Sequence, residues 1–137
     1  GFGAEIRRRI AAGGMEGRVV FPDRFVSDAE LRDEAAKCFA ALALYDTAPN
    51  NFTHYADPGK VKSAIEMGLP VVMTRISEIV PFIERFHAGE VIDSVADLPA
   101  ALSRIRRDPA SYFEGCRAFA EHFEYGRYYG AEGGFGR

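Results

Sequence analysis

Residues 51–74, with the sequence NFTHYADPGKVKSAIEMGLPVVMT, decide how the rest of this chain is interpreted. The stretch begins as a polar loop, enters a helix through Pro58–Lys60, and leaves that helix at Gly68 for the apolar strand Val71–Thr74. Proline suits the first helical position because its missing N–H would have no partner there. Glycine is the residue that most often follows the end of a helix. The stretch therefore predicts a loop, a short helix and a buried strand in succession.

This arrangement makes an anion site at the start of the helix. The first backbone N–H groups of a helix have no partner inside it, and the helix dipole places partial positive charge at that end. Lys60 adds a full positive charge in the same turn. Phosphate groups bind readily at such helix ends. The sequence therefore predicts a diphosphate as the ligand.

Helices and strands alternate on both sides of this unit. Ser27 and Glu30 form a capping box for a helix that runs to about Phe39. A helix is also expected at residues 4–13, and another from Ser77 to about Ala88, where Gly89 ends it. A further helix begins at Ser94 and is broken by Pro109. The last helix carries an apolar stripe of Tyr112, Cys116, Phe119 and Phe123. The strands are expected at Arg18–Phe21, Ala41–Tyr45, Val71–Thr74 and Glu90–Asp93. Strands that are apolar on both faces and are separated by helices predict an α/β fold with a doubly wound, parallel, Rossmann-like sheet.

Composition excludes several classes of protein. A length of 137 residues suits one domain, and a formal charge of −3 gives no reason to expect nucleic acid as a partner. No apolar run approaches the ~18 residues of a membrane helix. Cys38 and Cys116 fit helical patterns as small core residues, which indicates a reducing compartment. No cysteine or histidine has the spacing of metal ligands.

The central block resembles the donor-binding segment of B-type glycosyltransferases, which have two Rossmann-like domains, of the retaining, group 1 or family 4-like kind. Many of these enzymes carry a loop, then Pro-x-Lys, then a helix ending in Gly-x-Pro-Val-Val-x-Thr, as in Asp57–Lys60 and Gly68–Thr74. The turn at Gly1–Glu5 is similar to the family's Gly-x-Gly turn. The resemblance implies that residues 1–123 form part of a donor-binding domain. Residues 124–137 are then a glycine-rich C-terminal tail, which we expect to be mobile.

The resemblance also implies that the chain is a fragment of a larger enzyme. The chain opens on Gly1–Gly3, where the family has just completed a strand, so two central strands and the acceptor-binding N-terminal domain would be lacking. We expect that missing domain of the parent chain to be a partner, and we expect no activity from this chain alone. Open sheet edges predict strand-mediated self-association. The expected location is the cytoplasm. The parent protein would bring the chain to the cytoplasmic face of the membrane.

Lys60 matches the family lysine that approaches the phosphate or sugar of the donor, and Gly59 precedes it in the same turn. Ser63 stands where many family members have a glutamate that holds the ribose hydroxyls. Tyr55 stands eight positions earlier, where the family often has another acidic residue. The chain therefore departs from the family at both acidic positions, while serine and tyrosine can still form hydrogen bonds with a sugar.

The remaining candidates surround the same expected crevice. Asn51 and Thr53 offer hydrogen bonds to a sugar, and Asp57 does so too unless it only caps the Lys60 helix. Phe25 lies where the family packs the nucleobase, with core packing as the alternative. Thr74 ends a strand at the edge where ligands bind in such sheets. The sequence identifies no catalytic residue.

The implied reaction is transfer of a sugar from a nucleotide-diphosphate sugar to an acceptor. Its transition state resembles an oxocarbenium ion, and negative charge develops on the departing diphosphate. The helix N-terminus and Lys60 would stabilise that charge, so we expect neither a cofactor nor a metal.

Two alternatives from other classes remain open. The loss of both acidic residues allows a non-catalytic remnant that binds a nucleotide or a partner. A response-regulator receiver domain would use Asp46 and Thr74, but the acidic pair and the Lys-Pro of that class do not occur here.

Overall fold

The computed structural model describes residues 2–22, 24, 26–45, 59–75 and 78–129, with no side-chain description for residues 2 and 124–129. The chain divides into two compact units, Gly1–Asp33 and Glu34–Arg137. The first is a small N-terminal unit and the second contains the sheet; the expected domain over residues 1–123 stays a prediction.

The N-terminal unit contains helix α1 (Phe2–Ala12) and the start of helix α2 (Asp28–Ala35). The prediction of a strand at Arg18–Phe21 is wrong. This segment forms only an isolated bridge between Glu16 and Val19, and the side chain of Val20 is 89% exposed. The segment has strand-forming residues, but the described residues of its unit include no neighbouring strand, and a strand is stable only when its backbone groups are paired.

The capping box of α2 is confirmed. The hydroxyl of Ser27 accepts a hydrogen bond from the Glu30 N–H at 3.2 Å, and the Glu30 carboxylate accepts one from the Ser27 N–H at 3.1 Å. Arg24 also donates to this carboxylate, and these bonds lower the pKa of Glu30 to about 2. The helix ends at Ala35 instead of near Phe39.

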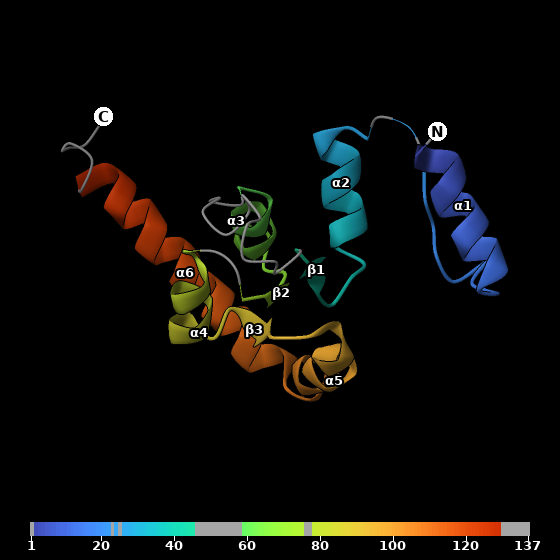
Figure 1. Ribbon diagram of the computed structural model, residues 1–137. Helices are drawn as coiled ribbons and strands as arrows, with labels where there is room; N and C mark the ends of the chain where they lie inside the picture. The colour runs from blue at the N-terminus through green and yellow to red at the C-terminus, as the bar shows by residue number, and fades with distance from the viewer. Residues whose placement is uncertain (1, 23, 25, 46–58, 76–77, 130–137) are drawn as a thin grey trace. The chain divides into compact units, whose positions relative to one another are not determined.

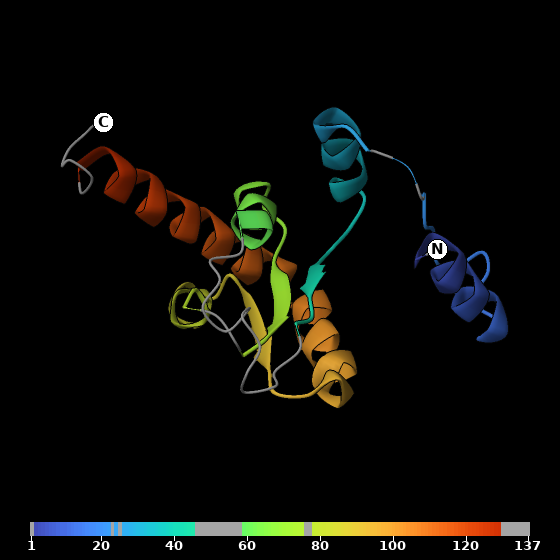
Figure 2. The same cartoon turned by 45° about the horizontal axis from the view of Figure 1, so that its top comes forward.

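The larger unit is built on a parallel sheet, as the sequence predicts. Its strands are β1 (Ala41–Ala43), β2 (Val71–Thr74) and β3 (Gly89–Ile92), in the order β1-β2-β3. Both neighbouring pairs are parallel, and the strands lie side by side in Figures 1 and 2. The expected α/β class with a partial Rossmann-like sheet is confirmed.

Helices cover both faces of this sheet. They are α3 (Gly59–Glu66), α4 (Val80–Phe86), α5 (Leu98–Arg107) after the short 3-10 turn η2 (Val95–Asp97), and α6 (Pro109–Tyr129). Pro109 begins α6, where its missing N–H has no cost, so it separates two helices as predicted. Helix α6 continues to Tyr129 and so crosses residue 124, where the sequence places the start of the tail. The domain boundary stays a prediction, and residues 130–137 lie outside the described part.

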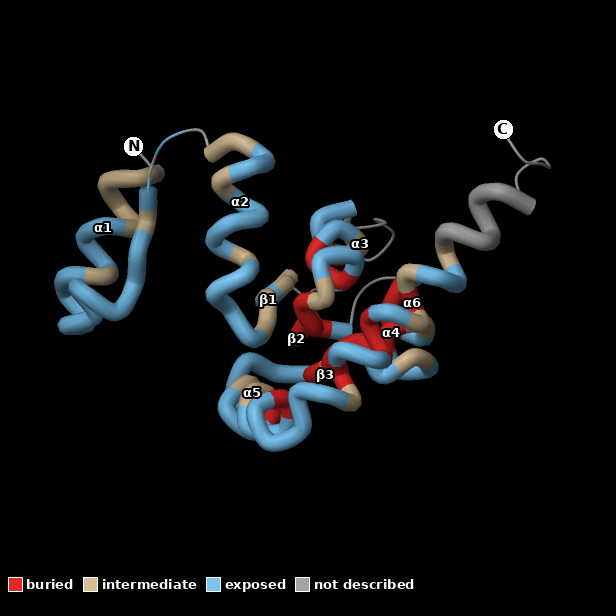
Figure 3. Tube along the Cα trace, turned by 180° about the vertical axis from the view of Figure 1, so that it is seen from behind, coloured by how far each residue is buried: buried red, intermediate tan, exposed pale blue. Residues whose placement is uncertain are grey.

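The alternating side chains of β2 build two cores. Val71 and Met73 belong to a cluster with α3, α4 and α6, whereas Val72 belongs to a second cluster with α5. The predicted stripe on α6 is present, since Cys116 and Phe119 are fully buried in the first cluster. Figure 3 shows the buried segments concentrated on β2, β3 and the helices that face them.

Strand β1 is less buried than predicted. Leu42 is 53% exposed and Leu44 is 40% exposed, because β1 lies at the edge of the sheet and α5 packs over β2 and β3. Cys38, in the segment that leads into β1, is exposed as well, so the expectation that it is a core residue is wrong. An apolar sequence alone does not show whether a strand is central or at an edge.

The turn between α4 and β3 also differs from the prediction. Gly89 does not end the helix but is the first residue of β3, where a Cβ atom would lie 1.9 Å from the backbone oxygen of Val71. The left-handed residue that ends α4 is His87, with φ of 61°. Ser77, expected to cap α4, lies outside the described residues.

Candidate functional site

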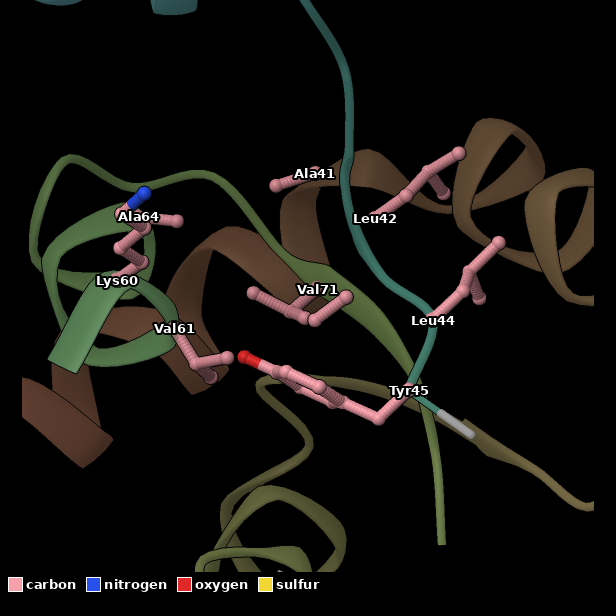
Figure 4. A pocket seen from close by; sticks show the side chains of 9 residues that line it. Ala41, Leu42, Leu44, Tyr45, Lys60, Val61, Ala64 and Val71 are labelled. Carbon is pink, nitrogen blue, oxygen red and sulfur yellow. The ribbon is translucent and has the colours of Figure 1, made fainter. Parts of the chain in front are cut away.

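A cavity of about 350 Å³ lies between β1 and α3 (Figure 4). Its lining is mostly apolar and consists of Ala41, Leu42, Ala43, Leu44, Tyr45, Lys60, Val61, Ala64 and Val71. Tyr45 and Lys60 contribute the two polar side chains of this lining. In Figure 4 the ring of Tyr45 points toward Val61, while Leu42 and Leu44 point to the other side of β1.

Lys60 occupies the position that the sequence predicts for a phosphate-binding cation. It lies in the first turn of α3, is exposed, and lines the cavity. Within the described part of the chain its ammonium forms no hydrogen bond or ion pair, whereas Lys62 on the same helix lies over the ring of Phe123 at 5.0 Å. Beside Gly59, a Cβ atom would meet none of the described residues within 4 Å.

Ser63 is exposed on α3, one turn after Lys60. The cavity is lined by Lys60 and Ala64 on this helix, and Ser63 is not part of the lining. Residues four apart on a helix lie on the same face. The structure therefore places Lys60, but not Ser63, against the cavity.

Thr74 joins the carboxyl ends of β1 and β2. Its hydroxyl accepts a hydrogen bond from the Tyr45 N–H at 2.9 Å and donates one to the Tyr45 carbonyl at 3.0 Å. The side chain is 3% exposed, and it is the buried polar residue of the described core. Its single proton is therefore used to hold the end of β1, which also positions Tyr45 beside the cavity. A contact between Thr74 and a donor stays a prediction.

Five of the predicted site residues lie outside the described part of the chain. Four are in the segment between β1 and α3, and one is in the N-terminal unit: Asn51, Thr53, Tyr55, Asp57 and Phe25. Their roles stay predictions.

Sequence reasoning missed Tyr45. Its side chain is half-buried, packs against the first core cluster, and lines the cavity with Lys60. The signal available in the sequence was a tyrosine at the end of an apolar run, directly before a polar loop. Only the pairing of β1 with β2 and the packing of α3 beside them bring this residue to Lys60.

Arg75 is a second residue that the sequence did not single out. It follows β2 directly, donates from Nε to Asp93 at 3.1 Å, and donates from both terminal nitrogens to Glu84 of α4 at 3.3 and 3.0 Å. The hydrogen bonds to Glu84, and then the one to Asp93, raise the pKa of Arg75. The guanidinium therefore connects the carboxyl ends of β2 and β3 to α4.

The fold and the cavity define an α/β domain with a lysine in the first turn of a helix beside a parallel sheet. Residues 18–130 match the family model described as "Glucosyltransferase 3-like, C-terminal domain". The chain belongs to this family and is thus related to glycosyltransferases. No curated protein sequence and no solved structure matches the chain.

Family membership favours the glycosyltransferase interpretation over the receiver-domain alternative. Asp46, the expected phosphorylation site in that alternative, lies outside the described residues, and the hydroxyl of Thr74 is bonded to the backbone of Tyr45. Among the described helices, none has both the length and the apolar character needed to cross a bilayer.

Proposed function

We propose that this chain is the donor-binding part of a glycosyltransferase that moves a sugar from a nucleotide-diphosphate sugar to an acceptor. The first turn of α3 and Lys60 bind the diphosphate of the donor. The acceptor-binding domain belongs to the parent chain, so this chain does not catalyse transfer alone. The family description names a glucosyltransferase, which favours a glucose nucleotide as the first donor to test.

The observation that carries the proposal is the place of Lys60. Its ammonium has no partner within the described residues, lies in the first turn of α3, and shares a cavity with the carboxyl end of β1. Ligands of open parallel sheets bind outside the carboxyl ends of the strands. The combination of these three features favours a phosphate-binding lysine over a surface lysine that serves only solubility.

The chemistry follows from where charge develops. As the bond between the sugar and the diphosphate breaks, negative charge grows on the leaving phosphate oxygens. Helix N–H groups and a lysine ammonium stabilise that charge more in the transition state than in the ground state, which is what accelerates a reaction. In this proposal Lys60 therefore contributes to donor affinity and to leaving-group stabilisation, with no metal required.

The loop between β1 and α3 supplies the rest of the donor site in this proposal. Asn51, Thr53 and Tyr55 form hydrogen bonds with hydroxyl groups of the donor, and Asp57 either joins them or caps α3. A nucleobase contact by Phe25 stays a prediction from the resemblance. The resemblance of the Asp57–Lys60 block to the donor loop of related enzymes supports these assignments.

A thermal-shift titration of the 137-residue chain with UDP, GDP, ADP and their glucose conjugates tests the proposal. We expect one nucleotide to raise the melting temperature and Lys60→Ala to weaken its binding about tenfold or more, because charge-assisted bonds to phosphate are worth about 1.5–3 kcal/mol.

Lys37→Ala is the matched control. Lys37 is also an exposed lysine, but its ammonium pairs with Glu34 at 3.1 Å and it does not line the cavity. This variant should bind the nucleotide as the unchanged chain does. Equal weakening by both variants would mean that Lys60 acts only through overall charge and would contradict the proposed site.

A non-catalytic remnant that still binds a nucleotide is the second candidate. The observation in its favour is the pair Ser63 and Tyr55, which stand where the resemblance implies acidic residues. Activity of the full-length parent with the bound nucleotide sugar separates the two candidates. Nucleotide binding without any transfer or donor hydrolysis by the parent would favour the remnant.

A further inference from the structure

The hydroxyl of Thr74 extends the pairing of β1 with β2 beyond the backbone ladder. In a parallel pair, alternate residues of one strand direct their N–H and C=O groups toward the neighbouring strand. The N–H of Ala41, at the start of β1, donates to the Pro70 carbonyl at 2.9 Å. Tyr45 also faces β2, but both its N–H and its carbonyl bond with the hydroxyl of Thr74, at 2.9 and 3.0 Å. This one side chain therefore holds the chain beyond Ala43, the last residue of β1.

Thr74 is itself held firmly enough to act as an anchor. It ends β2, which lies between β1 and β3, and it pairs with Ile92 in the register of β2 with β3. The N–H of the next residue, Arg75, donates to the Ile92 carbonyl at 3.1 Å. The side chain of Thr74 is buried, and a β-branched side chain has few rotamers. The direction of the hydroxyl is thus set by the sheet.

The residue that this anchor holds forms part of the wall of the candidate donor site. The side chain of Tyr45 packs against the first core cluster and lines the same cavity as Lys60. Figure 4 shows its ring directed toward Val61, which follows Lys60 on α3. A change in the backbone direction at Tyr45 would move this ring relative to the first turn of α3. The bonds to Thr74 fix that direction.

Tyr45 is also the point from which the chain continues toward α3. Residues 46–58 join Tyr45 to Gly59, the first residue of α3, and they contain most of the residues assigned to the donor in the proposed function. Ordering a segment around a ligand costs conformational entropy, and a site that is already partly ordered loses less of it on binding. A fixed start of this segment therefore favours donor binding.

We propose that Thr74 is a positioning residue of the donor site, which raises donor affinity through Tyr45 without touching the donor. The inference rests on the proposed function of the Lys60 site and adds a residue on which that site depends. Valine would fill nearly the same space as threonine but would leave the N–H and the carbonyl of Tyr45 without these two bonds. The hydroxyl is therefore the group to test.

Titration calorimetry of the 137-residue chain with UDP, GDP and ADP measures the effect. For the nucleotide that binds, we expect Thr74→Val to weaken affinity about three- to tenfold, the usual cost of lost pre-organisation. Thr74→Ser keeps the hydroxyl and should bind nearly as the unchanged chain does. Rescue by serine separates the hydrogen bonds of Thr74 from the space that its side chain fills.

Ile105→Val is the control for a general loss of stability. Ile105 is 1% exposed and belongs to the second core cluster, and it is not among the described residues that line the cavity. Removing a buried methylene destabilises a protein. Urea unfolding of the variants compares their stabilities, and Ile105→Val should bind the nucleotide as the unchanged chain does. A purely structural role of Thr74 would give the same result for Thr74→Val.

Amide hydrogen exchange tests the anchor directly. Without nucleotide, the Tyr45 amide should exchange at least about tenfold faster in Thr74→Val than in the unchanged chain. The Ala41 amide, which bonds to Pro70, is the reference and should stay protected. Because coupling is reciprocal, a bound nucleotide should slow exchange of the Tyr45 amide relative to this reference. That second comparison uses the unchanged chain and does not depend on whether a variant folds.

The outcomes distinguish this inference from the proposed function. Affinity that Lys60→Ala weakens and Thr74→Val leaves unchanged would overturn the role of Thr74 and keep the donor site. Equal weakening by Thr74→Val and Ile105→Val would overturn that role as well, and so would a Tyr45 amide that the nucleotide does not slow. Failure of the unchanged chain to bind any of the three nucleotides would refute the proposed function, and the role of Thr74 would fall with it.

Discussion

Burial separates the two cysteines of this chain at the scale of single residues. Cys116 is fully buried on α6, with its thiol 3.7 Å from the Ala88 carbonyl, and burial raises the pKa of this thiol to about 12. Cys38 is exposed, and its thiol lies 3.3 Å from the Glu34 carbonyl. Only a thiolate reacts readily with disulfide reagents, so the two residues should differ greatly in reactivity.

We therefore predict that an aromatic disulfide reagent labels one cysteine of the native chain and two cysteines of the unfolded chain. With a pKa of about 12, Cys116 is a thiolate in roughly one molecule in ten thousand near pH 8. Absorbance of the released thiol counts the reacting groups. Cys38→Ser should abolish the fast reaction of the native chain. Rapid labelling of this variant would show that Cys116 is accessible.

Glu90 shows how one partly buried carboxylate connects three elements. It lies on β3 and accepts hydrogen bonds from Nε of Arg104 on α5 at 2.7 Å and from the hydroxyl of Tyr112 on α6. Burial and then the Glu90 carboxylate raise the pKa of Tyr112, so the phenol stays protonated and remains a donor. The ring of His87 stacks on Tyr112 at 4.0 Å. These contacts hold α5 and α6 at the β3 edge of the sheet.

At the scale of elements, a glycine sets the distance between α6 and the end of α4. A Cβ atom on Gly115 would lie 2.1 Å from the backbone oxygen of His87 and 2.4 Å from that of Phe86. Such a contact forces a movement of backbone, since no side chain is available to give way. Close packing of α6 against α4 therefore requires glycine at this position.

Gly115→Ala should destabilise the chain by about 1–3 kcal/mol or more, the usual cost of overpacking. Urea unfolding followed by circular dichroism measures the change. Gly59→Ala is the matched control, because Gly59 also lies in a helix but a Cβ atom there comes within 4 Å of no atom in the described part of the chain. This control should be neutral or slightly stabilising. Equal unfolding midpoints for the two variants would contradict the packing argument.

At the scale of the whole molecule, both cores belong to the larger unit. The buried residues of the two clusters run from Val61 to Phe119, and no described residue of Gly1–Asp33 is buried. The hydrophobic contribution to stability is roughly proportional to the apolar area removed from water. The larger unit should therefore supply most of the stability of the chain.

We predict that a chain shortened to residues 34–137 keeps the main unfolding transition of the whole chain. Its thermal midpoint should change by only a few degrees, because the removed segment contributes no buried residue to either cluster. Calorimetry of the two chains measures this. Loss of the transition in the shortened chain would show that the N-terminal unit stabilises the sheet.

The sequence was sufficient wherever the cause of a structure is local. The capping box at Ser27, the helix through Lys60 and the strand Val71–Thr74 were predicted correctly, since caps, helix stops and apolar runs act over a few neighbouring residues. The parallel α/β class followed from the order of these elements. The resemblance of the chain to glycosyltransferases agreed with the family to which it belongs.

Tertiary structure decided what depends on segments distant in the sequence. Arg18–Phe21 has the composition of a strand but no partner strand among the residues that the structure describes in its unit, while the similar Ala41–Ala43 pairs with β2 and remains half exposed. Pairing and packing likewise brought Tyr45 to Lys60 and engaged the hydroxyl of Thr74. Local sequence determines which element a segment can form, but its neighbours determine which groups are buried, paired or left to bind.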